Sequence, residues 1–190
     1  GFEDIMAMET GFLQYMIALL KIDYAEELRL LGVTLPNVDK IPTVRFDEAK
    51  EKVAEKYHRQ IRNPYDLEPE EEALIGQYFK EEYDADFVFV TQYPSKNRPF
   101  YAMDDPAAPP YTVSIDLVYR IHDYNKLMEK IEKRGMEAEG MVQYLSVFKH
   151  GMPPHGGLGI GLERLTMKLV GEDNVRETTL FPRDLSRLEP

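Results

Sequence analysis

The most informative stretch of this 190-residue chain is MPPHGGLGIGLER, residues Met152–Arg164. It holds four glycines within the six positions from Gly156 to Gly161, and an amphipathic segment begins at Leu162. Because glycine has no Cβ, a packed helix or a bound group can approach this backbone closely. The first N–H groups of the following helix have no partners within that helix and are suited to an anion. The stretch therefore predicts a glycine-lined strand that leads into a helix.

The junction between this strand and helix lacks the two commonest nucleotide-binding motifs. GxGxxG fits from none of the four glycines, and no Gly-Lys-Ser/Thr follows as in a P-loop. Arg164 lies in the first turn of the predicted helix, where its planar guanidinium group could bind a phosphate or carboxylate through two N–H groups. From the glycine spacing alone, tight packing beneath a helix and ligand binding are equally good interpretations.

Upstream of the junction the pattern predicts helices first and strands later. Phe12, Tyr15, Met16 and Leu19 fall on one face of a predicted N-terminal helix. Further helices are predicted from Asp47, from Glu68, over 124–134, over 141–149 and from Leu162, and strands over 87–90, 98–103 and 112–119. This order predicts an α+β fold in which an antiparallel sheet is flanked by helices.

Two of these elements carry a specific expectation about burial. Glu70–Glu72 follows Pro69 at the start of a helix, and we interpret the acidic run as a solvated helix N-terminus rather than a metal site. Over 112–119 apolar residues occupy the odd positions and, up to Asp116, polar residues occupy the even ones. This alternation predicts a half-buried antiparallel strand.

The composition excludes several classes of function. The formal net charge is −11, which argues against a wide phosphate-binding surface but allows a local basic patch. The absence of cysteine removes disulfides and thiol catalysis, and the four histidines show no close ligand spacing, so we predict no dedicated zinc site and no metal ligands among these residues. No apolar run approaches the roughly 20 residues that span a bilayer. We therefore expect no membrane partner and a cytoplasmic location.

The C-terminal sequence resembles a known family. The stretch GGLGIGLERLTMKLVGEDNVRETTLFPRD, residues 156–184, is similar to the third signature motif of class II aminoacyl-tRNA synthetases. The ending FPRD…RLEP resembles aspartyl-tRNA synthetases of the archaeal type, a type also found in some bacteria. The resemblance continues upstream through DFVFVTQYPSKNRPFYAM (86–103), SIDLVYR (114–120), IHDYNKLMEKIEKRGM (121–136) and FKHGMPPHGG (148–157). It extends more loosely over the N-terminal helices.

The resemblance implies a class II catalytic core that activates an amino acid with ATP and transfers it to the 3′ end of tRNA. In this family the strand and helix of the third motif bind ATP, and the motif's arginine meets the γ-phosphate. Carried over to this chain, the implied ATP-binding residues are Gly159, Gly161, Leu162, Glu163 and Arg164. Arg164 is the implied catalytic residue.

The resemblance also implies the other substrates and partners. The amino acid would be L-aspartate, and the tRNA would be that for aspartate, with the tRNA for asparagine as a further acceptor. Arg120 and Tyr101 are the implied amino-acid-binding residues, although a core position is an equally good interpretation of Tyr101. The complete enzyme is implied to be a homodimer.

Several parts of the family pattern are missing from this chain. The first motif, which builds the dimer interface, the second motif, whose arginine grips the α-phosphate, and the anticodon-binding domain do not occur. We therefore interpret residues 1–190 as the C-terminal portion of a class II catalytic domain, and the initial Gly1 indicates that residues precede it.

A further part is missing between Arg120 and Ile121. There the family has a segment that contains a magnesium-binding glutamate and an amino-acid-binding arginine, so we place the Mg²⁺ ligands in the missing segment. Arg120 corresponds either to the arginine that ends the preceding strand or to the one that ends this segment. The segment is either deleted or left out of the sequence. We favour the second, because an excision in the middle of a strand is hard to fold.

Three alternatives to an aspartate–tRNA ligase stay open. The first is an asparaginyl-tRNA synthetase, which shares the same ancestry. The second is a tRNA-independent paralogue that resembles asparagine synthetase and uses the same adenylate. The third is a non-catalytic fragment that acts as a binding module. His122 and His155 lie near the predicted site, and we interpret both as structural hydrogen-bonding residues.

Overall fold

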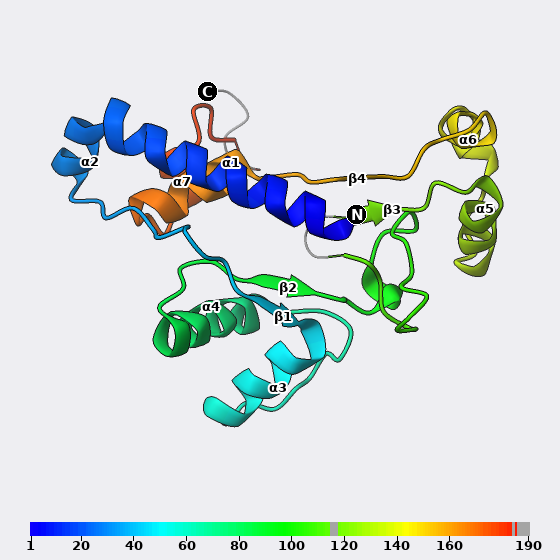
Figure 1. Ribbon diagram of the computed structural model, residues 1–190, viewed down its shortest axis with the longest axis horizontal. Helices are drawn as coiled ribbons and strands as arrows, with labels where there is room; N and C mark the ends of the chain where they lie inside the picture. The colour runs from blue at the N-terminus through cyan, green and yellow to red at the C-terminus, as the bar shows by residue number, and fades with distance from the viewer. Residues whose placement is uncertain (115–117, 184, 186–190) are drawn as a thin grey trace. The chain divides into compact units, whose positions relative to one another are not determined.

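The computed structural model describes residues 1–114, 118–183 and 185. Its elements (Figure 1) are, in chain order, α1 (Phe2–Asp23), α2 (Ala25–Leu31), β1 (Thr43–Arg45), α3 (Phe46–Lys56), α4 (Pro69–Tyr83), β2 (Phe89–Thr91), η1 (Ser95–Asn97), β3 (Val118–Arg120), α5 (Tyr124–Lys133), η2 (Glu139–Met141), α6 (Val142–Lys149), β4 (His155–Gly157), α7 (Leu162–Val170) and η3 (Val175–Thr178). The chain divides into two compact units. Unit 1 comprises Gly1–Glu9 and Lys40–Leu158, and unit 2 comprises Thr10–Asp39 and Gly159–Pro190.

In unit 1, β1 and β2 form a parallel pair in which Val44 lies opposite Val90. The predicted antiparallel sheet is wrong for this pair. Two parallel strands need a long crossover connection, and α3 and α4 lie between β1 and β2 in the chain and supply it. Both helices pack beside the strands (Figure 1) around a core of Val44, Ala49, Val53, Ile75, Phe79 and Ala85. The helices predicted from Asp47 and Glu68 are confirmed as α3 and α4.

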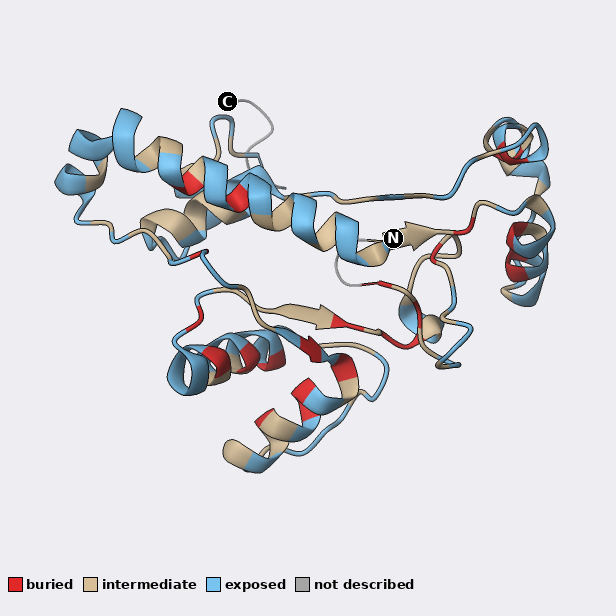
Figure 2. Cartoon of the chain, in the orientation of Figure 1, coloured by how far each residue is buried: buried red, intermediate tan, exposed pale blue. Residues whose placement is uncertain are grey.

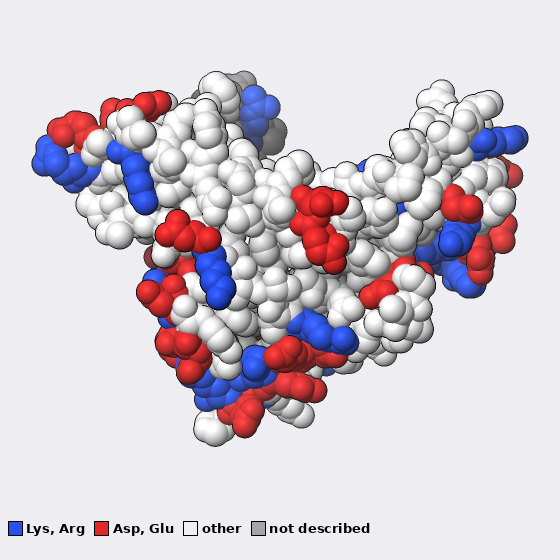
Figure 3. Space-filling view, viewed as in Figure 1, with Lys and Arg blue, Asp and Glu red and all other residues white. Residues whose placement is uncertain are grey.

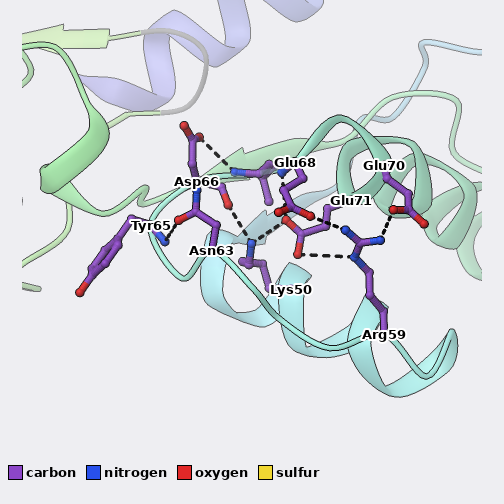
Figure 4. Close-up of polar contacts among 9 residues, drawn as sticks. Lys50, Arg59, Asn63, Tyr65, Asp66, Glu68, Glu70 and Glu71 are labelled. Carbon is purple, nitrogen blue, oxygen red and sulfur yellow. Dashed lines mark hydrogen bonds and ion pairs between the residues drawn. The ribbon is translucent and has the colours of Figure 1, made fainter.

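The acidic run at the start of α4 contains one buried residue. Glu70 and Glu72 are exposed, as predicted, but Glu71 is 2% exposed, so its prediction as a solvated residue is wrong. Its carboxylate accepts from Lys50 Nζ at 2.7 Å and from the backbone N–H of Glu68 at 2.9 Å (Figure 4). Lys50, itself 4% exposed, needs this carboxylate because an unpaired buried amine is costly.

Charged side chains continue around this buried pair. Arg59 pairs with Glu68 and Glu70 beside it (Figure 4). On the face drawn in Figure 3, positive and negative side chains are interleaved rather than separated into patches.

The other part of unit 1 is built on β3 and β4, which pair antiparallel with Arg120 opposite His155. This pair agrees with the predicted antiparallel sheet. Helices α5 and α6 pack together, and Figure 2 shows their buried faces. The core beneath them consists of Ile121, Leu127, Ile131, Leu145 and Phe148. The predicted helices over 124–134 and 141–149 are confirmed.

The segment before β3 has a different burial pattern from the one that the alternation predicts. Thr112 and Ser114 are fully buried, whereas Val113 is half-buried. The Thr112 hydroxyl lies 2.9 Å from the carbonyl oxygen of Tyr93 and 2.6 Å from the hydroxyl of Ser114, so both buried groups have partners. The predicted positions Ile115 and Leu117 lie outside the described residues.

In unit 2 the buried side of α1 differs from the predicted one. Leu13 and Ile17, four residues apart, are buried, while Phe12 is 47% and Tyr15 is 71% exposed. Gln14 fixes the following loop, because its Nε2 donates to the carbonyl of Val38 at 3.1 Å. The predicted helix is confirmed, but the face on which Phe12 and Tyr15 lie is not the buried face.

By length and composition alone, α1 could cross a membrane, and only 11% of its apolar window is buried. The expectation that no segment is long and apolar enough is therefore wrong for this helix. The core helix of a soluble protein satisfies the same two criteria, so length and composition do not distinguish the two cases.

Candidate active site

The third-motif residues form the start of α7 in unit 2. Gly161 is the N-cap, and Leu162, Glu163 and Arg164 are the first three residues of the helix. No side chain caps this end, so the first backbone N–H groups of a nine-residue helix have no partner from a capping side chain. The predicted ATP-binding residues therefore sit together at the positive end of a helix dipole.

Arg164 is exposed and folds back along the start of α7. Its Cβ and Cδ lie 3.9 and 4.0 Å from the place where a β-carbon on Gly161 would stand. Within the described part of the chain no ion pair engages its guanidinium group. These are ordinary van der Waals distances, so the aliphatic stem of Arg164 would also fit beside a larger residue at 161, and its charged end is available to an anionic ligand.

The sequence left two interpretations of the junction glycines open, tight packing and ligand binding, and different glycines agree with each. A β-carbon at Gly156 would meet Ile5 and the carbonyl of Val118, so this glycine serves tight packing. At Gly159 a β-carbon would have no described atom within 4 Å. Gly159 therefore has the open surface that a flat ligand needs, while Gly156 does not.

The start of α7 is also tied to the segment that follows it. The hydroxyl of Thr178 in η3 donates to the carbonyl of Glu163 at 2.8 Å and lies 3.1 Å from the carbonyl of Val175. Thr178 was not predicted as a site residue, because a threonine in an irregular segment carries no periodic signal. Its bond holds the backbone of the first turn, next to Arg164.

In unit 1 the structure brings the two predicted amino-acid-binding residues together. The guanidinium carbon of Arg120 lies 4.7 Å from the centroid of the Tyr101 ring, which is a cation–π contact. The backbone supports this contact, because Ala102 and Arg120 form an antiparallel bridge and Ile121 N–H donates to the Tyr101 carbonyl at 2.9 Å. Within the described residues Arg120 has no carboxylate partner.

Tyr144 on α6 adds a polar group beside this pair. Its hydroxyl is buried and has no hydrogen-bond partner among the described residues. Burial raises the pKa of Tyr144, and the nearby Arg120 opposes the rise. The ring of Tyr144 packs edge-on against Phe100 with centroids 6.0 Å apart. Sequence analysis missed Tyr144, because an aromatic residue in a short helix is usually interpreted as core.

His155 and His122, the two histidines predicted to be structural, differ in their hydrogen bonds. His155 Nδ1 lies 2.9 Å from the carbonyl oxygen of Pro153, and its ring packs against Phe148, which supports the structural role predicted for it. His122 Nδ1 is buried and has no partner among the described residues, so a structural hydrogen bond at this atom is not seen.

The described residues contain no group of three or more His, Asp or Glu side chains that could hold a metal ion. β3 ends at Arg120, and Ile121 is the next residue of the sequence. The predicted ATP-binding residues belong to unit 2, and Tyr101 and Arg120 belong to unit 1.

Comparison with known proteins adds a family and several relatives. The family described as tRNA synthetases class II (D, K and N) matches residues 1–185. The aspartate–tRNA(Asp/Asn) ligase of Aeropyrum pernix is 40% identical over 100% of this chain and 46% of its own length. The ligase of the same name from Deinococcus radiodurans is 42% identical over 99% of this chain and 47% of its own. The alignment with the Aeropyrum protein covers 202 residues, against 190 in this chain.

Solved structures share the fold. The aspartyl-tRNA synthetase from Entamoeba histolytica has a TM-score of 0.94 and 28% identity, and the match covers 100% of this chain and 42% of that one. An asparaginyl-tRNA synthetase from Pyrococcus horikoshii, complexed with asparaginyl-adenylate, has a TM-score of 0.88 and 27% identity, and covers 100% and 46%. This chain therefore spans less than half the length of these relatives.

Proposed function

This chain belongs to the class II tRNA synthetases for aspartate, lysine and asparagine, and on that premise we propose that it is the C-terminal part of the catalytic domain of an aspartate–tRNA ligase. The identity of 40% to an aspartate–tRNA(Asp/Asn) ligase over the whole chain supports the proposal. The observation that carries it is the exposed Arg164 at the uncapped start of α7, where a triphosphate can bind.

The first reaction of the complete enzyme joins aspartate to ATP. An oxygen of the aspartate α-carboxylate attacks the α-phosphorus, the bond from that phosphorus to the bridging oxygen breaks, and pyrophosphate leaves with the bonding electrons. No protein base is needed, because the carboxylate is already ionised near pH 7. The charge on the leaving pyrophosphate needs fixed cations and N–H donors.

Residues at the start of α7 supply part of that stabilisation. Arg164 binds the γ-phosphate, while the backbone N–H groups of Leu162 and Glu163 face the same anion. The open surface over Gly159 accommodates the adenine.

The amino acid is held by a different pair of residues. The Arg120 guanidinium group binds a carboxylate of aspartate, and the ring of Tyr101 keeps that group in place by the cation–π contact. In the second reaction a ribose hydroxyl at the 3′ end of tRNA attacks the activated carbonyl carbon, and AMP leaves. The tRNA for aspartate is the proposed acceptor, together with that for asparagine.

Further properties of the complete enzyme are part of the same proposal. We expect a homodimer that works in the cytoplasm. The Mg²⁺ that the family resemblance implies does not fit a ligand set in the described residues.

An asparaginyl-tRNA synthetase is the second candidate. Its support is the fold match to the Pyrococcus horikoshii enzyme, although the identity is 27% there against 40% to the Aeropyrum aspartate ligase. Amino-acid-dependent exchange of pyrophosphate into ATP separates the two candidates. The complete enzyme should exchange faster with aspartate than with asparagine, and the reverse ratio would favour the asparaginyl branch.

The role of Arg164 is tested by Arg164→Ala, with Lys168→Ala as the matched control. Both residues are exposed on α7, but Lys168 lies in the last turn. A charge-assisted bond to phosphate is worth about 2 kcal/mol, so Arg164→Ala should weaken ATP binding by about 30-fold. Lys168→Ala should leave it unchanged. Equal ATP affinity of Arg164→Ala and the native protein in calorimetry would refute the assignment.

A further inference from the structure

Lys130 on α5 is a buried charged residue that the proposed reaction does not use, and it is 8% exposed. Its Nζ donates to the carbonyl of Ala102 at 2.7 Å and to Oδ1 of Asp104 at 2.6 Å. Burial lowers the pKa of Lys130, and Asp104 opposes that shift. A buried amine is tolerated only where such bonds compensate for lost hydration, so this contact is specific.

Both acceptors belong to the segment 101–104, which carries Tyr101. The opposite edge of this segment is bonded to the region of β3: Ile121 N–H donates to the Tyr101 carbonyl, and Met103 N–H donates to the Tyr119 carbonyl, both at 2.9 Å. In an antiparallel pair, successive residues direct their backbone groups alternately toward and away from the partner. The carbonyl of Ala102 therefore points away from β3, and Lys130 binds it there.

The helix that carries Lys130 is attached closely to Arg120. β3 ends at Arg120, and Asp123 caps α5 by accepting from the N–H of Lys126 at 2.9 Å. Ile121 and His122 precede this cap, and the Ile121 N–H bonds to the Tyr101 carbonyl at 2.9 Å. The chain thus leaves Arg120, enters α5 and returns through Lys130 to the segment that faces Arg120.

A second contact strengthens the same connection. The carboxylate of Asp104 also accepts from the hydroxyl of Ser95 at 2.6 Å, and Arg134 at the end of α5 donates to the Ser95 carbonyl at 2.6 Å. The helix therefore holds 101–104 directly through Lys130 and indirectly through Arg134 and Ser95. Of these, only Lys130 touches the backbone next to Tyr101.

We propose that Lys130 is a positioning residue that fixes the segment 101–104 and so keeps the Tyr101 ring against the Arg120 guanidinium group. This inference rests on the proposed function, because the pair it positions is the proposed amino-acid-binding pair. Lys130 itself does not contact the amino acid.

The test compares Lys130→Met with Lys133→Met. Methionine keeps most of the aliphatic stem and removes the donor. Lys130 and Lys133 line one cavity of about 310 Å³ from the same helix, but the Lys133 side chain is 70% exposed, and its ion pair among the described residues is with Glu129. The control therefore removes a neighbouring charge without touching 101–104.

Two readouts are measured on the full chain. The first is the ring-current shift of the Arg120 side-chain protons in NMR, with Tyr101→Leu giving the value without a ring. Lys130→Met should move this shift toward the Tyr101→Leu value, and Lys133→Met should not. The second is the dissociation constant for L-aspartate in calorimetry, which Lys130→Met should raise about tenfold, as expected for one lost polar contact.

A native ring-current shift in folded Lys130→Met would overturn the proposal. Should that variant fail to fold, Asp104→Asn keeps the amine and its bond to Ala102 but weakens the ion pair, and a smaller displacement in the same direction is then expected. An unchanged shift in Asp104→Asn would count against the proposal. If the shift moves as expected but the native chain binds no aspartate, the positioning stands and the proposed amino-acid site fails.

Discussion

The side chain of Ile5 in α1 occupies the space that a β-carbon on Gly156 in β4 would need. The carbonyl of Val118 on the paired strand lies 3.3 Å from the same position. At this glycine the absence of a side chain serves the packing of a helix on a strand. Gly157, the next residue, has no described atom within 4 Å of its own β-carbon position.

Gly156→Ala should therefore destabilise the chain. Overpacking costs about 1–3 kcal/mol. The end of the Ile5 side chain can shift, which keeps the expected loss near the lower end of this range. The Val118 carbonyl cannot shift, so part of the loss remains. Urea unfolding measures the loss, with Gly157→Ala as the control that should cost less. Adding Ile5→Ala to Gly156→Ala should recover part of the loss. An equal loss in both glycine variants would contradict the packing role.

The buried pair Lys50–Glu71 leads to a second prediction. Lys50→Met leaves the buried Glu71 carboxylate with only the distant Arg59, whose Nε lies 3.9 Å away, and should lower the free energy of unfolding by about 3–5 kcal/mol. Lys52→Met on the same helix removes an ion pair to Glu48 and a cation–π contact to Tyr78 at the surface, and should cost less than about 1 kcal/mol. Denaturant titration compares the two variants. The double variant Lys50→Met/Glu71→Leu should be more stable than Lys50→Met alone, because no unpaired charge remains.

The buried hydroxyl of Tyr144 has no hydrogen-bond partner among the described residues, so its removal is expected not to lower the free energy of unfolding. Burying a hydroxyl without a partner costs free energy, so Tyr144→Phe should leave the stability unchanged or raise it by about 1 kcal/mol. Tyr57→Phe is the control, because its hydroxyl lies 3.3 Å from the carboxylate of Glu81. Thermal unfolding of the two variants decides the point, and a clear loss of stability in Tyr144→Phe would show that its hydroxyl has a partner in solution.

Sequence patterns predicted the positions of the helices better than they predicted which side of each helix is buried. Ala49 and Val53 recur four residues apart and are buried on α3, because only one side of that helix is apolar. On α1 both sides are apolar, so the spacing of Phe12 and Tyr15 did not distinguish the exposed side from the buried side of Leu13 and Ile17.

The local sequence patterns did not predict which polar side chains are buried. Thr112 and Ser114 can be buried because each hydroxyl has a hydrogen-bond partner. Glu71 can be buried because its carboxylate pairs with Lys50, which lies on another helix. Such partners are fixed by tertiary contacts, which a local pattern does not contain. For the same reason the resemblance identified Arg120 and Tyr101 separately, while their contact became visible only in the structure.

The surface pair of Lys56 and Glu81 predicts how the pKa of Glu81 changes when Lys56 is replaced. The hydrogen bond from Lys56, followed by the one from Gln77, lowers the pKa of Glu81 from its ordinary 4.5. Because the folded-state pKa is the lower one, this contribution to stability is present above pH 4.5 and is lost as the pH falls through the folded-state pKa. Lys56→Met should raise the pKa of Glu81 toward 4.5, as measured by the carboxyl ¹³C shift. Lys52→Met removes a charge from the same helix without touching Glu81, and an equal change in both variants would assign the effect to overall charge instead.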